Sequence, residues 1–282
     1  MSDLELSGAN PQLRPSEFEM IRELAMKSFG LELRTGKEWL VASRLGKHLR
    51  AGGFRSFRQY YDRVRSDSSG EMLIGLIDAL TTNHTGFLRE PAHFDFMQEL
   101  LRSEFRNRKS IDIWCAASAT GEEPYTLLFS ALSCTERSAP LDVHLVASDI
   151  STRALSTARK GTYTRERVAA LPAEWKSRFF EKGNDVPAEC LQVRAQFRSR
   201  ISFQRINLIE KLPVNTEFPL IFCRNVMIYF NKATQTEVVA RLAAKLEPGG
   251  YLFVGHSESL SGMTHSLRYV KPAVYQKASA RN

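Results

Sequence analysis

The sequence predicts an α/β protein in which a small all-helical region precedes a doubly wound, mostly parallel sheet. Residues 15–80 show apolar residues only at helical spacing. From Ser110 onward, short apolar runs alternate with helical patterns, which is typical of a parallel sheet with helices on both faces. The length of 282 residues also suits one large domain and one small one better than a single average domain.

Four helices are expected in the first part of the chain. Phe18 and Ile21 recur at helical spacing in the first helix, and the others are expected at residues 39–49, 57–64 and 72–80. Glycine-containing segments separate these patterns. Residues 1–80 are therefore predicted to form one helical domain.

The second part contains short apolar runs that are typical of buried strands. Strands are expected at residues 111–116, 144–150, 201–208, 220–226 and 251–257. Helices are expected at 124–132, 151–160 and 234–246, and Ser151 is the predicted cap of the second of these.

The alternation breaks down between residues 179 and 206. Residues 183–187 are predicted to form a turn, and LQVRAQF followed by RISFQRI is typical of a small antiparallel arrangement. An antiparallel insertion is therefore expected at about residues 180–206.

The composition is that of an ordinary soluble globular protein, with 43% hydrophobic and 25% charged residues. No apolar run is long enough for a membrane span, and the acidic, polar N-terminus does not resemble a secretory signal, so a cytoplasmic location is expected. The four cysteines lack C-x-x-C spacing, which argues against a zinc site and a disulfide framework. Cys115 and Cys223 lie in apolar runs and are expected to be buried.

The basic residues are concentrated in one segment of the chain. The formal net charge is +8, and residues 34–65 alone contain nine Lys or Arg against two acids, a local charge of +7. Such a segment can be a solvated helix face or a surface that binds an acidic partner, and its one-sided sign keeps both interpretations open.

Residues 81–94, TTNHTGFLREPAHF, place polar chemistry where a linker is expected. Asn83, Thr85 and Arg89 supply an amide, a hydroxyl and a permanent cation within seven residues. Phe87 and Leu88 are apolar enough to hold the segment against a core. We therefore expect this segment to contact a ligand.

Helix capping is the alternative explanation of the same segment. Thr81, Thr82 and Asn83 could cap a helix that starts near Pro91. Capping explains Arg89 poorly, because a cation at a helix start opposes the macrodipole.

Further candidates follow the predicted strands, since ligands of open α/β sheets bind beyond the carboxyl ends of the strands. The first strand is followed by AASATGEE, whose small residues allow close backbone approach although no G-x-G-x-x-G cradle is present. Asp149 could accept hydrogen bonds from the hydroxyls of an adenosine ribose, or could cap the next helix. Asn207 with Leu208, and Asn225 with Val226, stand at two further strand ends.

Several segments resemble known methyltransferases. LEPGGYLFVG resembles the late helix and strand of class I S-adenosylmethionine-dependent methyltransferases. More specifically, TTNHTGFLREPAHF, WCAASATGEEPY, ASDI, INLIEK and IFCRNVMIYF resemble, in this order, the CheR family, which methylates glutamates of chemotaxis receptors. The resemblance implies a class I methyltransferase-like doubly wound sheet with an antiparallel last strand, a three-stranded antiparallel insertion and an all-α N-terminal domain.

The resemblance also implies roles for particular residues, with S-adenosyl-L-methionine as the cofactor and S-adenosyl-L-homocysteine as its product. Arg89 and Tyr229 are the implied catalytic residues. The implied cofactor-binding residues are Asn83, Thr85, Arg89, Glu123, Asp149, Asn207, Leu208, Asn225 and Val226. One departure is the segment Gly86 to Leu88, where the family often carries a second aromatic residue before the arginine and this chain has leucine, which preserves the packing.

The implied reaction is attack of a receptor glutamate on the cofactor's methyl group, which gives a γ-methyl ester. The nucleophile is ionised at neutral pH, so no general base is needed and catalysis depends on alignment and desolvation. Arg89 is the candidate to orient the carboxylate, and Tyr229 the candidate to hold the geometry by a hydrogen bond.

A basic helix face is the candidate surface for acidic receptor helices. Basic residues recur at spacings of seven and three between residues 37 and 47, while Val41, Leu45 and Leu49 lie on another face. A basic face would raise the rate of encounter with glutamate-rich helices. The substrate-binding candidates are Lys37, Arg44, Lys47 and Arg50.

The predicted organisation is thus a substrate-recognition domain at residues 1–80, a linker at 81–95 that contributes to the active site, and a catalytic domain at 96–282. A monomer is expected, with no metal, nucleic acid or membrane insertion. In some family members the β insertion docks a receptor's C-terminal peptide, and the sequence leaves this open. A nucleic-acid methyltransferase is disfavoured because NVMIY lacks the Pro-Pro-aromatic motif, whereas a non-enzymatic cofactor-binding module of the same fold is a further alternative.

Overall fold

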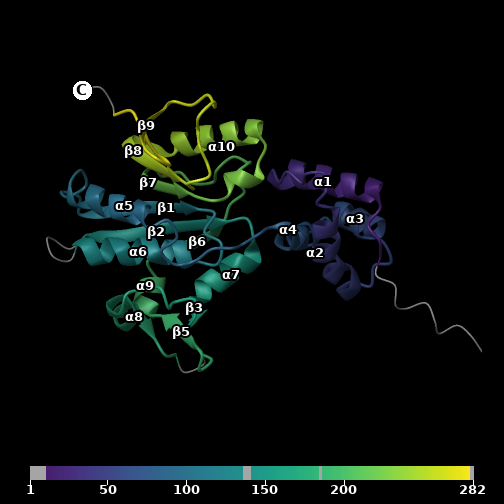
Figure 1. Cartoon of the computed structure of the whole chain (residues 1–282), viewed down its shortest axis with the longest axis horizontal. Helices are drawn as coiled ribbons and strands as arrows, with labels where there is room; N and C mark the ends of the chain where they lie inside the picture. The colour runs from purple at the N-terminus through teal and green to yellow at the C-terminus, as the bar shows by residue number, and fades with distance from the viewer. Residues whose placement is uncertain (1–10, 136–140, 184–185, 280–282) are drawn as a thin grey trace, which may run out of the picture. The chain divides into compact units, whose positions relative to one another are not determined.

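The chain is described by a computed structural model that covers residues 11–135, 141–183 and 186–279. The remaining parts of the predicted ranges, including the middle of the predicted turn at 183–187, lie outside the described residues. The chain forms two compact units that divide between Thr82 and Asn83 (Figure 1).

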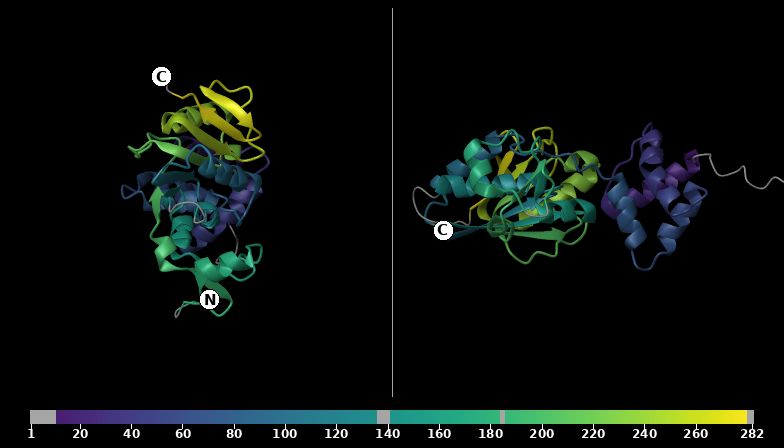
Figure 2. Two further views of the ribbon diagram at one scale, coloured as in Figure 1. Left: turned by 90° about the vertical axis from the view of Figure 1, so that its left-hand side faces the viewer. Right: turned by 90° about the horizontal axis from the view of Figure 1, so that it is seen from below.

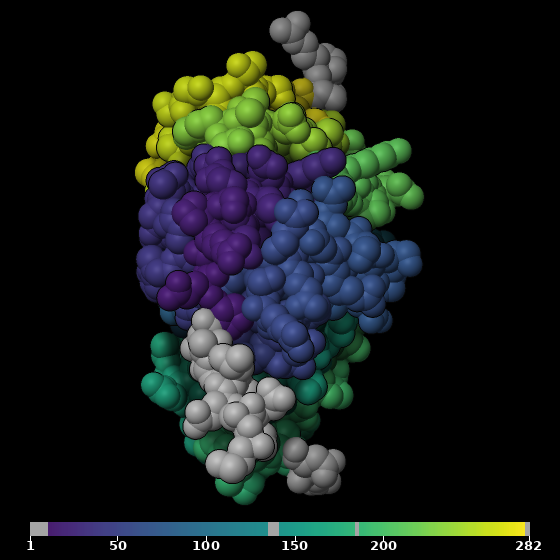
Figure 3. Space-filling model, turned by 90° about the vertical axis from the view of Figure 1, so that its right-hand side faces the viewer, coloured from purple at the N-terminus to yellow at the C-terminus, as the bar shows by residue number. Residues whose placement is uncertain are grey.

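The first unit contains the predicted helices. Among its described residues, the helices are α1 (Pro15–Phe29), α2 (Glu38–Ala51), α3 (Phe57–Ser66) and α4 (Glu71–Leu80). Their outer surface is coloured purple to blue in the space-filling view (Figure 3).

The apolar face predicted for α2 is confirmed. Val41, Leu45 and Leu49 are fully buried, because residues three or four apart share one face of a helix. Glu17 of α1 is also buried, and its carboxylate accepts hydrogen bonds from the backbone N–H groups of Arg14 and Arg58 at 2.9 Å.

The second unit is built on a seven-stranded sheet within the described residues, with the order β6-β2-β1-β7-β8-β10-β9. The first five strands of this order pair in parallel, whereas β10 is antiparallel to β8 and β9. The doubly wound fold with antiparallel terminal strands is therefore confirmed. The strands are β1 (Ser110–Ala116), β2 (Asp142–Asp149), β6 (Ile201–Arg205), β7 (Phe218–Cys223), β8 (Leu246–Val254), β9 (Leu267–Lys271) and β10 (Val274–Lys277).

Helices cover both faces of this sheet, as the alternation of side chains in β1 shows. Ile113 and Cys115 belong to the hydrophobic cluster that contains residues of α5 (Ala92–Arg102) and α6 (Glu122–Thr135). Trp114 belongs to a second cluster that contains residues of α10 (Lys232–Ala244). Successive strand residues point to opposite faces, so both faces are apolar and both are buried. The expectation that Cys115 and Cys223 are buried is confirmed.

A second, three-stranded antiparallel sheet has the order β3-β5-β4. Its strands are β3 (Thr162–Thr164), β5 (Cys190–Val193) and β4 (Phe180–Glu181), and α8 (Ala173–Phe179) and α9 (Ala195–Arg198) adjoin it. Within its unit, it lies at the opposite end from β9 and β10 (Figures 1 and 2).

The predicted bounds of the insertion, residues 180–206, were wrong at both ends. The small sheet begins at Thr162, and β6 pairs in parallel with β2 in the main sheet. The residues after Val193 turn into α9 instead of continuing a hairpin. Periodicity identified the strand at 201–205 but carries no information about which strand it pairs with.

Of two smaller predictions, the one at the start of β8 differs from the structure and the Ser151 cap is confirmed. The strand predicted at residues 251–257 is β8, which begins earlier, at Leu246, and has an irregular register opposite residues 218–220. Ser151 does cap α7 (Thr152–Lys160), since its hydroxyl accepts a hydrogen bond from the N–H of Ala154 at 3.0 Å. None of the described helices combines the length and the apolar character that a membrane span requires.

Gly121 is expected to be essential for the packing of the turn after β1. Its φ is +101°, and an added Cβ would lie 2.5 Å from the Tyr163 hydroxyl and 2.9 Å from the Ala158 Cβ. Gly121→Ala should lower the free energy of unfolding by about 3 kcal/mol through backbone strain and overpacking, measured by urea denaturation.

Gly75→Ala is the matched control, because Gly75 lies inside α4 and no atom lies within 4 Å of the added Cβ. This variant should gain about 0.5–1 kcal/mol from the higher helix propensity of alanine. Equal midpoints for Gly121→Ala and the parent would contradict the close packing at Gly121.

Candidate functional site

The candidate site lies at the carboxyl ends of β1 and β7. The chain runs from β1 to β2 and later to β6 on one side of the sheet, and then returns to place β7 on the other side of β1. Neighbouring connections at this point leave in opposite directions, and such a switch point is where open α/β sheets bind ligands. The turns at 117–121 and 224–226 and the segment 83–91 belong to this region.

Backbone strain is concentrated in these segments. Among the described residues, six non-glycine residues have positive φ, and five of them belong to the three segments named above. Such conformations persist only where surrounding contacts determine them, and they cluster at functional sites. The five residues are Leu88, Glu90, Ala117, Ala119 and Asn225.

A buried arginine links the three segments. The Arg224 side chain is fully buried, with Nη1 3.0 Å from Glu123 Oε2 and Nη2 3.1 Å from Glu90 Oε2. Nη2 also donates a hydrogen bond to the carbonyl oxygen of Arg89, and the guanidinium lies over the ring of Phe94. The contact with Glu123 is an ion pair without hydrogen-bond alignment. Two carboxylates thus share one guanidinium, which leaves an excess of acidic groups suited to a cationic ligand.

The pKa values of the two carboxylates are shifted in opposite directions. Burial raises the pKa of Glu123, and the charge of Arg224 opposes this shift only in part. Burial also opposes the ionisation of Glu90, but Arg224, Asn225 and the His256 backbone bring the pKa of Glu90 below its ordinary value.

Asp149 organises the edge of the site next to β2. Its two carboxylate oxygens accept hydrogen bonds from the backbone N–H groups of Ala119 at 2.8 Å and Ser151 at 2.9 Å. The capping role considered for Asp149 is filled by the Ser151 side chain. An ionised carboxylate only accepts hydrogen bonds, so ribose hydroxyls are donors of the kind that this side chain suits.

The segment before α5 is held by its apolar residues, as expected. Phe87 is buried, and its ring packs edge-on against Tyr163 with 5.0 Å between the ring centres. Asn83 Nδ2 donates to the Ser151 hydroxyl at 3.4 Å. Thr85 is half-buried. Arg89 is half-buried and donates one hydrogen bond, to the carbonyl oxygen of His84 at 3.2 Å.

The capping alternative for this segment was wrong. Thr81 terminates α4, and the residue at the N-cap of α5 is Pro91. The seven residues 83–89 belong to no helix and separate Thr82 from Glu90, so Thr81 and Thr82 are too far along the chain to cap α5.

The remaining cofactor candidates lie after β6 and β7. Asn207 Nδ2 donates to Glu210 Oε1 at 2.7 Å, and Leu208 is buried. The chain just before them is tied to Asp149, because the N–H of Ile206 donates to the Asp149 carbonyl oxygen at 3.2 Å.

Asn225, Val226 and Tyr229 stand together on the β7 side. The side-chain amide of Asn225 donates to Glu90 Oε1 at 3.3 Å. Val226 and Tyr229 are half-buried and pack against the second hydrophobic cluster, with Tyr229 at the end of the short 3-10 helix η1 (Met227–Tyr229). The structure therefore brings the candidates from four strand ends to one edge of the sheet.

The basic candidates belong to the first unit. Lys37, Lys47 and Arg50 are exposed on α2. Arg44 is half-buried, and its guanidinium donates hydrogen bonds to the carbonyl oxygen of Leu80 and to the Thr82 hydroxyl. Arg44 thus satisfies a carbonyl at the end of α4, a role that its sequence spacing did not reveal.

Sequence reasoning missed Arg224, Glu258 and His93. Arg224 directly follows a buried strand. An arginine is always charged, so at a buried position it requires an acidic partner. Glu258 belongs to the segment GHSE that follows β8, which had no assigned role. His93 gave no signal beyond its position in a helix.

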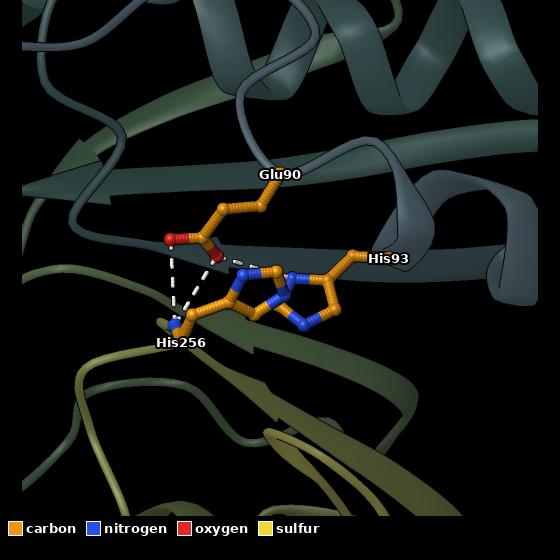
Figure 4. A group of neighbouring side chains, drawn as sticks. All are labelled: Glu90, His93 and His256. Atoms are coloured by element: carbon orange, nitrogen blue, oxygen red, sulfur yellow. Dashed lines mark hydrogen bonds and ion pairs between the residues drawn. The ribbon is translucent and has the colours of Figure 1, made fainter.

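Glu90, His93 and His256 form the group of described residues that could ligate a metal ion, with ligand atoms within 4.8 Å of one another (Figure 4). The group lacks the orienting contacts usual for metal-binding histidines, since neither ring nitrogen of buried His93 has a hydrogen-bond partner. Glu90 is also already bonded to Arg224, Asn225 and the His256 backbone. We interpret the group as a packed junction between α5 and the end of β8.

Comparisons with known proteins agree with this architecture. The family model described as CheR methyltransferase, SAM binding domain, matches residues 83–275, and the model described as CheR methyltransferase, all-alpha domain, matches residues 16–81. Chemotaxis protein methyltransferase 2 of Pseudomonas aeruginosa is 39% identical, with 93% of each chain covered. The chemotaxis protein methyltransferase of Borreliella burgdorferi is 34% identical, covering 95% of this chain and 96% of the relative. That of Salmonella typhimurium is 35% identical, covering 93% and 90%.

His93 is expected to make stability depend on pH. Burial, followed by the charge of Arg224, lowers the pKa of His93 to about 4. The unfolded chain, with a histidine pKa near 6.5, therefore binds the proton more readily, and stability falls as the pH falls from the unfolded value toward the folded one. From pH 8 to pH 5 this histidine should cost about 2 kcal/mol of unfolding free energy.

Urea denaturation of the parent and of His93→Phe at both pH values checks this expectation. The variant keeps a planar ring against Phe253 and removes the titrating group. Its loss of unfolding free energy between pH 8 and pH 5 should therefore be about 2 kcal/mol smaller than that of the parent. The same loss in both proteins would mean that His93 binds protons equally in the folded and unfolded chains.

Proposed function

Because the chain belongs to the CheR methyltransferase family and is an S-adenosylmethionine-dependent methyltransferase, we propose that it methylates glutamate side chains on the cytoplasmic helices of bacterial chemoreceptors. The product is a glutamate γ-methyl ester, and the output is chemotactic adaptation. The observation that carries this proposal is that both family models match in order over residues 16–275, while relatives that this chain covers over nine-tenths of their length are named chemotaxis methyltransferases. We propose that the protein acts as a monomer in the cytoplasm.

The residues at the strand ends fit the cofactor. Small residues with positive φ at Ala117 and Ala119 leave the backbone after β1 open to close approach. Asp149 at the end of β2 carries an acceptor group of the kind that binds ribose hydroxyls, and Glu90 and Glu123 outnumber the one cation between them. We propose that the cofactor is held by Asn83, Thr85, Arg89, Glu123, Asp149, Asn207, Leu208, Asn225 and Val226.

When bound, S-adenosylmethionine supplies an electrophilic methyl group on a sulfonium. The glutamate side chain of the receptor is ionised at neutral pH, so the protein has no proton to remove from it. What this chain contributes is orientation of the nucleophile and exclusion of water.

Arg89 and Tyr229 are the proposed catalytic residues. Arg89 donates one hydrogen bond to a backbone carbonyl, and a guanidinium has five N–H donors, so donors remain to orient a carboxylate. Tyr229 is held by its packing at the end of η1 while its side chain stays partly accessible. Its hydroxyl is proposed to fix the geometry of the transfer.

The helical unit is the proposed substrate-recognition domain, with residues 81–95 as the linker that contributes to the active site. Lys37, Lys47 and Arg50 present three exposed cations on α2, and Trp39 adds an aromatic ring that is 66% exposed. Cations and an exposed aromatic anchor suit a surface that binds acidic helices. Arg44 is proposed to support this surface, because it also joins α2 to the end of α4.

The small antiparallel sheet is the proposed docking site for the C-terminal peptide of a receptor. A pocket beside this sheet is lined by two cations, Lys160 and Lys182, and one acid, Glu181, among other residues, so its lining has a net positive charge that suits a peptide carboxylate. Strand addition to an open sheet edge would supply the backbone hydrogen bonds.

Transfer of tritiated methyl groups to a purified chemoreceptor cytoplasmic domain tests the proposed function. Counts that are released by mild alkali are expected, because an ester is alkali-labile and a methylated amine is not. Removing the receptor's C-terminal residues should raise KM without changing the alkali lability. Alkali-stable counts, or no transfer to the receptor, would contradict the proposal.

Variants of the two catalytic residues sharpen this assay. Arg89→Ala should lower kcat/KM about 100-fold through loss of alignment. Tyr229→Phe should lower kcat about tenfold through loss of one hydrogen bond and should leave cofactor affinity unchanged. Near-normal turnover in both variants, with normal cofactor binding, would mean that the catalytic assignments are wrong.

Charge reversal on α2 should weaken receptor methylation. Lys47→Glu combined with Arg50→Glu is expected to lower kcat/KM for the receptor about tenfold at low salt and less at high salt, with unchanged cofactor affinity. Arg44→Glu should in addition destabilise the helical unit, because it loses the contacts with Leu80 and Thr82.

Lys109→Glu is the matched control for charge, since Lys109 is exposed at the amino end of β1, away from the site edge. It should leave receptor methylation within twofold of the parent. Equal losses in Lys109→Glu and in the double variant with Lys47→Glu and Arg50→Glu would point to net charge instead of a defined face.

A further inference from the structure

The segment GHSE after β8 contains a buried carboxylate that the proposed mechanism does not use. Glu258 is 6% exposed. Its Oε2 accepts hydrogen bonds from the backbone N–H groups of Asn225 and Gly255, both at 2.7 Å. Its Oε1 accepts from the N–H of Ile228 at 3.2 Å. One side chain therefore ties the turn after β7 to the turn after β8.

The turn after β7 needs this support because its conformation is strained. Asn225 has a φ of 56°, in the left-handed region that disfavours residues with a Cβ. Its backbone N–H is fixed by Glu258, and its side-chain amide is fixed from another direction by Glu90 Oε1 at 3.3 Å. Two carboxylates from distant parts of the sequence, those of Glu90 and Glu258, thus fix the conformation of Asn225.

The two turns also approach each other too closely for any residue but glycine at position 255. An added Cβ there would lie 2.5 Å from Asn225 Nδ2 and 2.8 Å from Glu258 Oε2. Both residues therefore affect Asn225. Gly255 leaves room for its side-chain amide, and Glu258 accepts a hydrogen bond from its backbone N–H.

We infer that Glu258 is a positioning residue of the methyl-transfer site, which holds Asn225, Val226 and the start of η1 in the conformation that binds the cofactor. This inference rests on the proposed placement of Asn225 and Val226 in the cofactor pocket. A carboxylate is needed because it only accepts hydrogen bonds, whereas the amide of a glutamine would direct donors at backbone N–H groups.

Glu258→Gln tests the inference in the full-length protein, with S-adenosylmethionine as the titrant in calorimetry and with steady-state kinetics. The variant should bind the cofactor about tenfold more weakly, because one charged acceptor of three N–H groups is lost. KM for the cofactor should rise to match, while KM for the receptor stays within twofold. Glu258→Asp should recover part of the affinity, because it restores the carboxylate.

Glu17→Gln is the matched control. Glu17 is a buried carboxylate that also accepts two backbone N–H groups, and it belongs to the other compact unit. It should lose stability but keep its affinity for the cofactor. Affinity that falls equally in Glu17→Gln and Glu258→Gln would overturn the inference, since the effect would then follow general loss of stability.

If Glu258→Gln folds poorly, Gly255→Ala is a second variant that displaces Asn225. It should weaken cofactor binding in the same way, and combining it with Glu258→Gln should cost less than the product of the two separate effects, because both displace Asn225. Parent-like affinity in both single variants would overturn the inference.

Asn225→Ala distinguishes an error in the role of Glu258 from an error in the proposed cofactor pocket. Loss of affinity in Asn225→Ala, with parent-like affinity in Glu258→Gln, would overturn the role of Glu258 alone. Parent-like affinity in all these variants would overturn both the role of Glu258 and the placement of Asn225 in the pocket.

Discussion

The site depends on the buried guanidinium of Arg224. It is the cation that Glu90 and Glu123 share, and removing it would leave the buried carboxylate of Glu123 without its cation, which typically costs several kcal/mol. The two acids come from segments on either side of β1 in the sequence, so the charge requirement alone keeps residues 83–91 against the strand ends. Hydrophobic contacts such as Phe87 against Tyr163 also hold the segment in place. They constrain its orientation less than the contacts of the guanidinium do, because those contacts depend on direction.

The strained turns are the second consequence of this arrangement. Positive φ at Leu88, Glu90 and Asn225 costs free energy at each residue, and the surrounding structure offsets that cost. The core can do so because both faces of the sheet are packed, with Ile113 facing one cluster and Trp114 the other. A rigid sheet with strained, bonded turns at its edge is the kind of scaffold that holds reacting groups in a fixed geometry.

The sequence predicted those features that follow from local pattern. The buried face of α2, the positions of five strands of the main sheet and the Ser151 cap were all predictable, because periodicity and capping are local properties. The pairing of β6 with β2 was not, since a strand's partner depends on distant chain. The network of Arg224 was also not predictable, because its partners Glu90 and Glu123 are 134 and 101 positions away in the sequence. The same holds for Arg44, whose partners lie 36 and 38 residues away.

The use of acidic groups at the site fits the chemistry of an ionised nucleophile. Asp149 and Glu258 accept backbone N–H groups, and Glu90 and Glu123 pair with Arg224. Each of these four carboxylates therefore has a structural partner. A receptor glutamate arrives already ionised, so the reaction asks for no base. The acids can then all serve to position the backbone and the cofactor, and catalysis rests on how closely they fix the strand-end turns to which Asn225 and Tyr229 belong.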